Sequence, residues 1–468
     1  MKTGSASSGR LIESLRVKHG ARSRTMKEGE STSSRPGPEA FDFSDHPDLR
    51  RFEMMEKAVN ALGMQSPFFR LHESSPGPDQ RVSGVDVVNF ASYDYLGLNQ
   101  APEVLAAAQS TLANTGISPG ASRLVGGERL SQQRLEVRLA ENYSAEAAVA
   151  MVSGHATNVT TIGTLLEPED LILTDQLAHN SIFEGARLSG ANRVSFPHND
   201  FDWLERYLSQ SRHRYRNVMI AVEGLYSMDG DMPDLARLID IKKRHDCWLM
   251  VDEAHALGVL GLTGRGTAEA QDVDPRQVEI WMGTLSKTLG SCGGYIAGSA
   301  ALVKLLKHRA PGFVFSVGLS PVLAAGAEAA LRLMRAAPDR VSRLQQNGRV
   351  FLDALKGHGL DMGSAQGYAV APVITGDSVK AVALSSALFD QGINALPVIY
   401  PAVPEKAARV RFFVTSEHDA SQLIEIAQKI AACMTALEEG MVGVSQQVSE
   451  IASMLKSQAS GSILDLKP

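Results

Sequence analysis

Residues 247–255 read CWLMVDEAH, an apolar run that ends abruptly in two carboxylates and a histidine. A short, continuous apolar run of this kind fits a strand that is buried on both faces. Asp252 then lies at the carboxyl end of the strand, where open α/β sheets bind their ligands. Taken alone, the aspartate could equally cap a following helix, so its meaning depends on the surrounding pattern.

Similar short runs occur on both sides of this stretch, at 147–152, 171–174, 218–222, 280–283 and 295–297. Helical patterns at 101–113, 131–142, 155–165 and 234–245 lie between the runs, and residues 320–358 form one long helix or two that join at Pro338. Apolar strands that alternate with helices predict an α/β fold with a mostly parallel sheet, covered by helices on both faces.

The chain is too long for one compact core, and its pattern predicts several parts. Residues 1–45 form a disordered extension, and 46–100 an N-terminal segment with a helix at 49–62 and a strand at 85–90. A large domain at 101–330 is followed by a smaller C-terminal α/β domain at 331–438, with strands at 368–374 and 408–414. The tail, 439–468, is partly helical, and its apolar spacing favours packing on this protein or a dimer mate over binding a separate partner.

Composition excludes several classes of protein. A net charge of −6 gives no footprint for nucleic acid or anionic membranes, and no apolar run is long enough for a membrane helix. The three cysteines are far apart, which argues against a disulfide framework and for a reducing compartment. The N-terminus has no apolar signal region, and Glu13, Glu28 and Glu30 favour a cytosolic extension over a transit peptide. We therefore expect a cytoplasmic protein.

A second motif, GTLSKTLG at 283–290, follows the predicted strand at 280–283. Lys287 alone could be a solvated loop lysine, and a P-loop is excluded because Ser286 rather than glycine precedes it. Together, Asp252 and Lys287 lie at the ends of successive strands. An aspartate for a protonated ring nitrogen and a lysine that forms a Schiff base are what pyridoxal 5'-phosphate requires. Such a lysine reacts as a neutral amine, so its site should lower its pKa.

The cofactor's phosphate also needs a site. Ser153-Gly154-His155 follows the strand at 147–152 and begins a helical run, where free backbone N–H groups and the helix dipole attract phosphate. Thr284 and Ser286 could add hydroxyl contacts. Many helices begin this way, so the motif is weak alone. The zinc motif H-E-x-x-H is absent, and we expect no metal site.

The blocks from about residue 65 to 437 resemble the α-oxoamine synthases, a family that includes serine palmitoyltransferase and 8-amino-7-oxononanoate synthase. The similarity depends on several blocks in a fixed order. They are NFASYDYLGL (89–98), ASRLVGGE (121–128), DQLAHNS (175–181), EGLYSMDGD (223–231), VDEAHALGVLGLTGRG (251–266), 283–294 and RFFVTSEH (411–418). The resemblance implies the fold of type I pyridoxal-phosphate enzymes.

It also implies a role for individual residues. Lys287 is the lysine that binds the cofactor, Asp252 its ring-nitrogen partner, and His179 the residue that stacks on the ring, although outside the motif His179 would be a surface histidine. Contacts to the ring oxygen come from His255 and Ser227, and contacts to the phosphate from Gly154, His155, Thr284 and, across a homodimer interface, Ser316. Arg411 matches the arginine that binds the substrate carboxylate; otherwise it would form a surface salt bridge, and the adjacent Arg409 is expected at the surface.

The reaction implied is a decarboxylative condensation of a small L-amino acid with an acyl thioester. Lys287 takes the Cα proton as general base, and His179 and His255 orient cofactor and thioester. Tyr93 stands where glycine- and alanine-using members usually carry Asn, and is more like serine palmitoyltransferase. Ser122 stands where glycine-specific members carry a bulkier Thr. These positions favour L-serine, then L-alanine or glycine. The sequence departs from the family at Gln132, where many relatives carry His, and this difference has no interpretation.

Other functions remain open. Within the family, the alternative is an 8-amino-7-oxononanoate synthase that uses L-alanine and a pimeloyl thioester. Outside it, a fold-type I aminotransferase or lyase shares the lysine and aspartate, and a non-catalytic subunit keeps the fold but can lose the lysine. Some segments resemble synthases that work with polyketide synthases, so the acyl group comes from acyl-CoA or from a separate acyl carrier protein.

Overall fold

The computed structural model describes residues 42–61 and 66–459. The chain divides into two units, Met1–Ala58 and Val59–Pro468. A short turn of 3-10 helix, Phe43–Asp45, precedes helix α2, Pro47–Ala61, which was predicted at residues 49–62 and which includes the boundary between the two units. The disorder predicted for 1–45 falls almost entirely outside the described residues.

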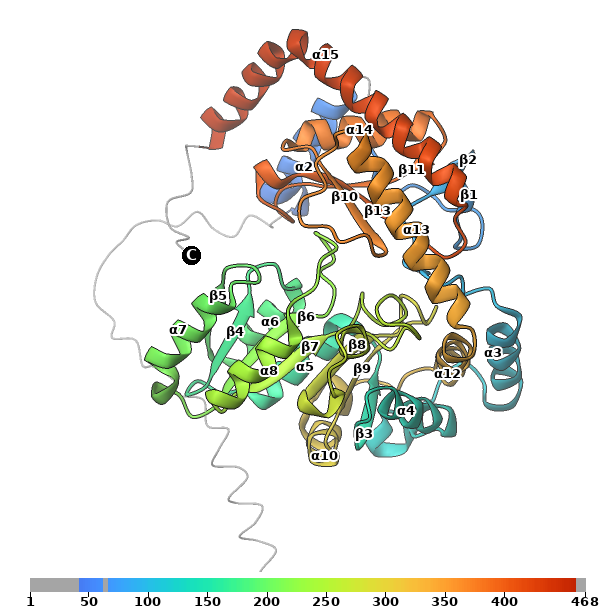
Figure 1. Cartoon of the computed structure of the whole chain (residues 1–468), viewed down its shortest axis with the longest axis vertical. Coiled ribbons are helices and arrows are strands. Elements are labelled where there is room, and N and C mark those ends of the chain that lie inside the picture. Colours follow the sequence, from blue (N-terminus) through green and yellow to red (C-terminus); the bar gives the residue numbers. More distant parts are fainter. Residues whose placement is uncertain (1–41, 62–65, 460–468) are drawn as a thin grey trace, which may run out of the picture. The chain divides into compact units, whose positions relative to one another are not determined.

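A seven-stranded sheet forms the centre of the second unit, with the order β3-β9-β8-β7-β6-β4-β5 (Figure 1). All strands run parallel except β9, which is antiparallel to both of its neighbours. The sheet confirms the predicted fold class and each of the six predicted strands, but β5 was missed. The strands are β3 Ala147–Met151, β4 Leu171–Asp175, β5 Asn192–Phe196, β6 Val218–Glu223, β7 Trp248–Asp252, β8 Ile280–Thr284 and β9 Gly294–Gly298.

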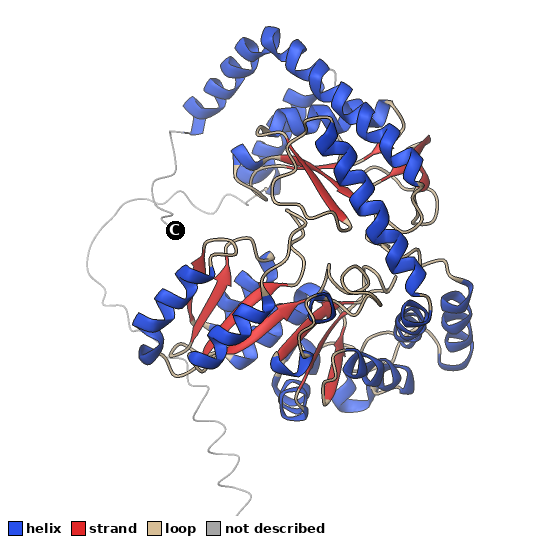
Figure 2. Cartoon of the chain, viewed as in Figure 1, coloured by secondary structure: helices blue, strands red, loops and turns tan. Residues whose placement is uncertain are grey.

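Helices cover both faces of this sheet, as Figure 2 shows. Alternate residues of each strand point to opposite faces; in β4, Leu171 and Leu173 belong to one apolar cluster and Ile172 to the other. One cluster includes residues of α3 Pro102–Thr115, α4 Leu130–Asn142, α7 Phe201–Ser211, α8 Leu235–Arg244, α12 Pro321–Ala336 and α13 Pro338–Gly357. The other includes residues of α5 Gly154–Leu165, α6 Asn180–Ser189, α10 Ala300–Arg309 and α11 Pro311–Val314.

A third apolar cluster lies in the C-terminal part of the chain and includes Phe351, Phe412 and Ile426. It packs the antiparallel sheet β10-β13-β12 against helices α13, α14 and α15. Pro338 separates α12 from α13, and β10 and β13 confirm the strands predicted at 368–374 and 408–414. The elements are β10 Val370–Ile374, α14 Ser378–Asp390, β12 Leu396–Val398, β13 Arg409–Phe413 and α15 Ala420–Ala459.

The N-terminal segment joins this C-terminal part through a small sheet. Strand β2 (Val85–Asn89) pairs with β1 (Asp79–Val82) on one side and with β11 (Ile393–Asn394) on the other. Among the described residues, no helix is both long and apolar enough to cross a bilayer. The domain boundaries at residues 100, 330 and 438 stay predictions.

Candidate active site

The carboxyl edge of the central sheet collects polar residues from four parallel strands. Asp175, Glu223, Asp252 and Thr284 are the last residues of β4, β6, β7 and β8. Glu223 and Asp252 are direct neighbours in the ladder, and all four residues are buried. Parallel strands end at one edge, so the fold itself concentrates these groups where a ligand can reach them.

Lys287 lies in the turn that follows β8, close enough to Asp252 and Glu223 for both carboxylates to favour its charged form. Burial nevertheless has the larger effect and lowers the pKa of Lys287 to about 8. Its Nζ atom is 5.8 Å from the centre of the Tyr93 ring. The structure therefore brings Lys287 and Asp252 together, as the sequence predicted, and supplies a lysine that is readily neutral.

Asp252 is held by two hydrogen bonds. Asn158 Nδ2 donates to Asp252 Oδ2 at 2.8 Å, and the Ala254 N–H donates to Oδ1 at 2.9 Å. Asn158, on α5, also donates to Ser181 Oγ, which is 2.7 Å from Nδ1 of His179. A chain of polar contacts thus links the aspartate to His179. Both hydrogen bonds fix the orientation of the Asp252 carboxylate.

The two histidines are in different surroundings. His255 is buried, with Nδ1 2.6 Å from the Tyr95 hydroxyl, and its ring is parallel to that of Phe413. Burial, reinforced by Lys287 and Arg411, lowers the pKa of His255 well below 6.5. His179 is exposed to solvent, but neighbouring protein atoms partly desolvate its ring and lower its pKa, against the influence of Asp252. Both histidines are therefore neutral near pH 7.

The predicted phosphate site is formed by the start of α5 and the end of β8. Ser153 caps the helix by accepting from the Ala156 N–H, which leaves N–H groups of the first turn without intrahelical partners. A Cβ atom at Gly154 would lie 2.9 Å from Thr284 Oγ1, so only glycine allows this approach. Thr284 Oγ1 lies 2.7 Å from Ser286 Oγ. Gly154, Thr284 and Ser286 are thus brought together, next to His155.

Arg411, on β13, reaches this region from the C-terminal part of the chain. Its Nη1 donates to the Ser227 carbonyl at 2.9 Å, and its guanidinium lies 4.5 Å from the centre of the Phe413 ring. Its Nε is buried without a hydrogen-bond partner in the described part of the chain. Tyr93 packs edge-on against Phe413, with ring centres 4.7 Å apart. Arg411 therefore has free donor capacity close to Lys287.

Two predicted residues are not brought to this cluster. Ser122 precedes a single π-helical turn, Arg123–Gly127, and Ser316 follows α11. Their segments meet where the Gly318 N–H donates to the Ala121 carbonyl, but no contact among the described residues joins either serine to Lys287.

The prediction for Arg409 was wrong. It is 6% exposed, and its guanidinium donates to the Met228 carbonyl and to Asp229. Two charged residues so close together in a sequence are often both exposed. Here Arg409 and Arg411 are two positions apart on β13, so their side chains share one face of the strand.

Sequence reasoning also missed Asn158 and Glu223. Asn158 is one helical turn after Gly154, so its spacing could have placed it on the ligand side of α5. Glu223 is the last residue of β6, just as Asp252 is the last residue of β7. The apolar run that ends in a carboxylate, which identified Asp252, could therefore have identified Glu223 as well. Burial, and then the neighbouring Asp252, raises the pKa of Glu223 to about 8. Glu223 is consequently neutral near pH 7.

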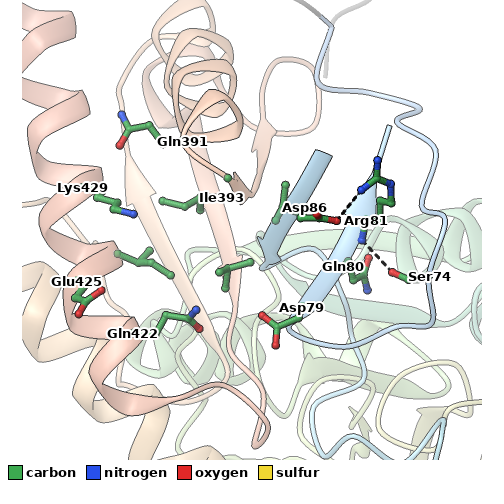
Figure 3. Close-up of a pocket in the computed structure, with 14 residues that line it drawn as sticks. Ser74, Asp79, Gln80, Arg81, Asp86, Gln391, Ile393, Gln422, Glu425 and Lys429 are labelled. Atoms are coloured by element: carbon green, nitrogen blue, oxygen red, sulfur yellow. Dashed lines mark hydrogen bonds and ion pairs between the residues drawn. The ribbon is translucent and has the colours of Figure 1, made fainter. Parts of the chain in front are cut away.

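A separate cavity of about 630 Å³ lies elsewhere (Figure 3). It opens between the β1-β2-β11 sheet and α15, and no predicted site residue lines it. It is lined by Ser74, Asp79, Gln80, Arg81, Asp86, Val87, Val88, Gln391, Gly392, Ile393, Gln422, Glu425, Ile426 and Lys429. Since it contains neither Lys287 nor Asp252, we do not assign the chemistry to it.

The site fits pyridoxal phosphate. A buried carboxylate faces a lysine with a lowered pKa, and glycine leaves room at a helix start for phosphate. Buried polar atoms of Asn158, Glu223 and Arg411 lack partners within the described residues, which is the pattern expected where a polar ligand completes the hydrogen bonding. Fold and site together define a fold-type I pyridoxal-phosphate enzyme.

Comparison with known proteins narrows the class. The family model for aminotransferase class I and II matches residues 85–430. The chain is 40% identical over 355 residues to an 8-amino-7-oxononanoate synthase of Beijerinckia indica, covering 76% of this chain and 90% of that protein. The chain is also 37% identical over 351 residues to the 8-amino-7-oxononanoate synthase of Thermoanaerobacter pseudethanolicus, which covers 75% of this chain and 88% of that protein.

Solved structures agree with this. Serine palmitoyltransferase of Sphingomonas wittichii superposes with a TM-score of 0.80 at 27% identity, over 85% of this chain and 99% of that one. A variant of the serine palmitoyltransferase of S. paucimobilis, with a bound PLP-myriocin aldimine, superposes with a TM-score of 0.81 at 26% identity, over 85% of this chain and 100% of that one. The chain belongs to the class I and II aminotransferase family and, within it, to the α-oxoamine synthases. It is a pyridoxal-phosphate-dependent acyltransferase that condenses a small amino acid with an acyl thioester and releases carbon dioxide.

Proposed function

We propose that the amino acid is L-serine, ahead of L-alanine and glycine. The observation that supports this choice is Tyr93, whose ring packs on Phe413 and lies near the Lys287 amine. Its hydroxyl has no hydrogen-bond partner in the described part of the chain, so it can bind a substrate hydroxyl that alanine and glycine lack. The serine palmitoyltransferases among the structural matches are consistent with this substrate by name.

We assign the other residues the roles that the resemblance to the α-oxoamine synthases implies. Asp252, oriented by hydrogen bonds from Asn158 and the Ala254 N–H, holds the pyridine nitrogen. Gly154, His155, Thr284, Ser286 and, across a dimer interface, Ser316 hold the phosphate. Ser227 and His255 approach the ring oxygen, and His179 packs on the ring face. When bound, the cofactor withdraws electrons from the substrate Cα.

Proton transfer is then assigned to Lys287. Because burial makes its amine readily neutral, it can accept the proton from the amino acid Cα and later return one to the product. Arg411 holds the substrate carboxylate through its free Nε and an Nη donor. His255 and His179, both neutral, orient cofactor and thioester without adding positive charge that would compete with Lys287.

Spectroscopy and product analysis test this proposal. Purified enzyme should carry the visible band of lysine-bound pyridoxal phosphate, and Lys287→Ala should lose it. L-serine should perturb the band at lower concentration than L-alanine or glycine, and Tyr93→Phe, which removes only the hydroxyl, should abolish that preference. Carbon dioxide should be released only when an acyl thioester is present. An unchanged ranking in Tyr93→Phe would contradict the serine assignment.

A second candidate is condensation of L-alanine with a pimeloyl thioester. The curated relatives quoted above, at 37–40% identity, are 8-amino-7-oxononanoate synthases, which favours it. The two candidates differ in both substrates, so a matrix of L-serine and L-alanine against pimeloyl-CoA and palmitoyl-CoA separates them. Activity confined to L-alanine with pimeloyl-CoA would establish the second and reject the first.

We also propose a homodimer whose two subunits share each active site. Ser122 and Ser316 do not reach Lys287 within one chain, yet they lie among large exposed apolar side chains, which indicate a contact surface. These side chains are Ile117, Leu124, Val125, Phe315 and Val317. Val125→Glu combined with Phe315→Glu should give a monomer by light scattering. Inactive Lys287→Ala and Ser316→Glu subunits, when mixed, should regain activity only if Ser316 acts across the interface.

The acyl donor is proposed to be acyl-CoA or an acylated carrier protein, and parallel assays with both will show which is used. The three free cysteines are consistent with a reducing cytoplasm, which we propose as the location. The large domain at 101–330 and the smaller one at 331–438 are proposed as the catalytic subdomains, with Arg411 contributed by the smaller one.

A further inference from the structure

The turn at 226–231, between β6 and α8, carries Ser227 and has few internal bonds. The Tyr226 N–H donates to the Asp231 carbonyl and the Gly230 N–H to the Tyr226 carbonyl. Gly230 has φ +73°, and a Cβ atom there would lie 2.3 Å from the Val370 carbonyl oxygen of β10. The turn is thus pressed against the C-terminal sheet, and its position depends on groups outside it.

Arg409 holds the middle of this turn. Its Nη1 donates to the Met228 carbonyl at 2.8 Å and to Asp229 Oδ1 at 2.7 Å, and both side chains are largely buried. Arg411, on the same strand, donates from Nη1 to the Ser227 carbonyl at 2.9 Å and more weakly to the Met228 sulfur at 3.5 Å, and forms no ion pair within the described residues. If a carboxylate ligand draws Arg411 away, the bonds of Arg409 remain.

His198 holds the last residue of the turn, Asp231. Its Nδ1 lies 3.0 Å from Asp175 Oδ1 and its Nε2 2.9 Å from Asp231 Oδ2. Burial opposes a charge on this ring, but hydrogen bonds to the two carboxylates raise the pKa of His198 to about 10. The imidazolium therefore ties the last residue of the turn to the end of β4. Both aspartates are buried, which makes this bridge costly to break.

We propose that Arg409 and His198 are positioning residues, which hold the 226–231 turn so that Ser227 stays in place while Arg411 exchanges the Ser227 carbonyl for the substrate carboxylate. Both residues contact protein groups of the turn and of β4 rather than any group assigned to the cofactor or the substrate. The inference depends on the proposed roles of Ser227 and Arg411. It adds different roles for the two arginines of β13: Arg409 holds the turn, and Arg411, whose Nε has no partner in the described residues, binds the ligand.

Hydrogen exchange of the apoenzyme tests the attachment directly. In Arg409→Gln, the Tyr226 and Gly230 amides should exchange about tenfold faster, because local opening becomes easier, while amides of β6 and β7 should be unchanged. Lys380→Gln is the matched control, since it removes another ion pair of the C-terminal part, Lys380–Glu438. It should leave the turn as in the wild type. Unchanged exchange in Arg409→Gln, or an equal acceleration throughout the sheet, would overturn the proposal.

His198→Gln should accelerate the same amides. If that variant does not fold, Asp231→Asn weakens the same bridge while keeping the side-chain shape, and should have the same local effect. In the holoenzyme, Arg409→Gln should raise the KM for the amino acid more than it lowers kcat, a split that general loss of stability does not produce. If L-serine fails to perturb the wild-type spectrum, the proposed function fails, whereas the exchange result stands or falls separately.

Discussion

Glu223 gives a prediction whose sign is unusual for a carboxylate. Burial and the adjacent Asp252 raise its pKa from 4.5 to about 8. Below pH 4.5 the side chain is protonated in both folded and unfolded states. Between pH 4.5 and 8 only the unfolded state loses the proton, so the free energy of unfolding falls as pH rises. At about 1.4 kcal/mol per pH unit, the loss from Glu223 is at most about 5 kcal/mol, and near pH 7 about 3 kcal/mol.

Glu223→Gln should remove this loss. The amide oxygen can still accept from the Ser227 N–H, as Glu223 Oε2 does at 3.2 Å, and its NH2 group replaces the protonated hydroxyl. Urea unfolding of the apoenzyme from pH 4.5 to 8 should show the variant equal to wild type at the acidic end and increasingly more stable above it. Glu169→Gln, at an exposed carboxylate, is the control and should not diverge. A variant less stable than wild type at pH 8, or a difference independent of pH, would refute the reasoning.

Two further substitutions test the site's construction. Asn158→Ala leaves a buried oxygen of Asp252 without its donor and should lower the free energy of unfolding by about 1–3 kcal/mol, measured in urea. The exposed Asn114→Ala should change the free energy of unfolding by less than about 0.5 kcal/mol. Equal effects of the two substitutions would argue that Asp252 needs no support. Gly154→Ala places a Cβ against Thr284 and should weaken cofactor binding to the apoenzyme about tenfold by fluorescence titration. Gly357→Ala, where nothing lies within 4 Å, should bind normally.

The sequence predicted most of the sheet because strands buried on both faces appear as continuous apolar runs. The edge strand β5, Asn192–Phe196, has mostly partly exposed or exposed residues and gave no such run. Lys287 and Asp252 could be paired because the ends of parallel strands share one edge. The contacts of Arg409 and His198 could not, because each joins segments far apart in the chain, and spacing along the sequence does not encode which loops meet.

The buried carboxylates near the site also explain why cationic residues lie beside them. Asp175, Asp252, Asp229 and Asp231 are carboxylates in or beside a buried edge, and unpaired they would destabilise the fold. His198 compensates two of them and Arg409 one, which leaves Asp252 without an ion-pair partner in the part of the chain that the structure describes. The remaining cations near it, Lys287 and Arg411, are those to which chemistry and substrate binding are assigned. An enzyme that must keep one aspartate for its cofactor gains from neutralising the others with residues that take no part in the reaction.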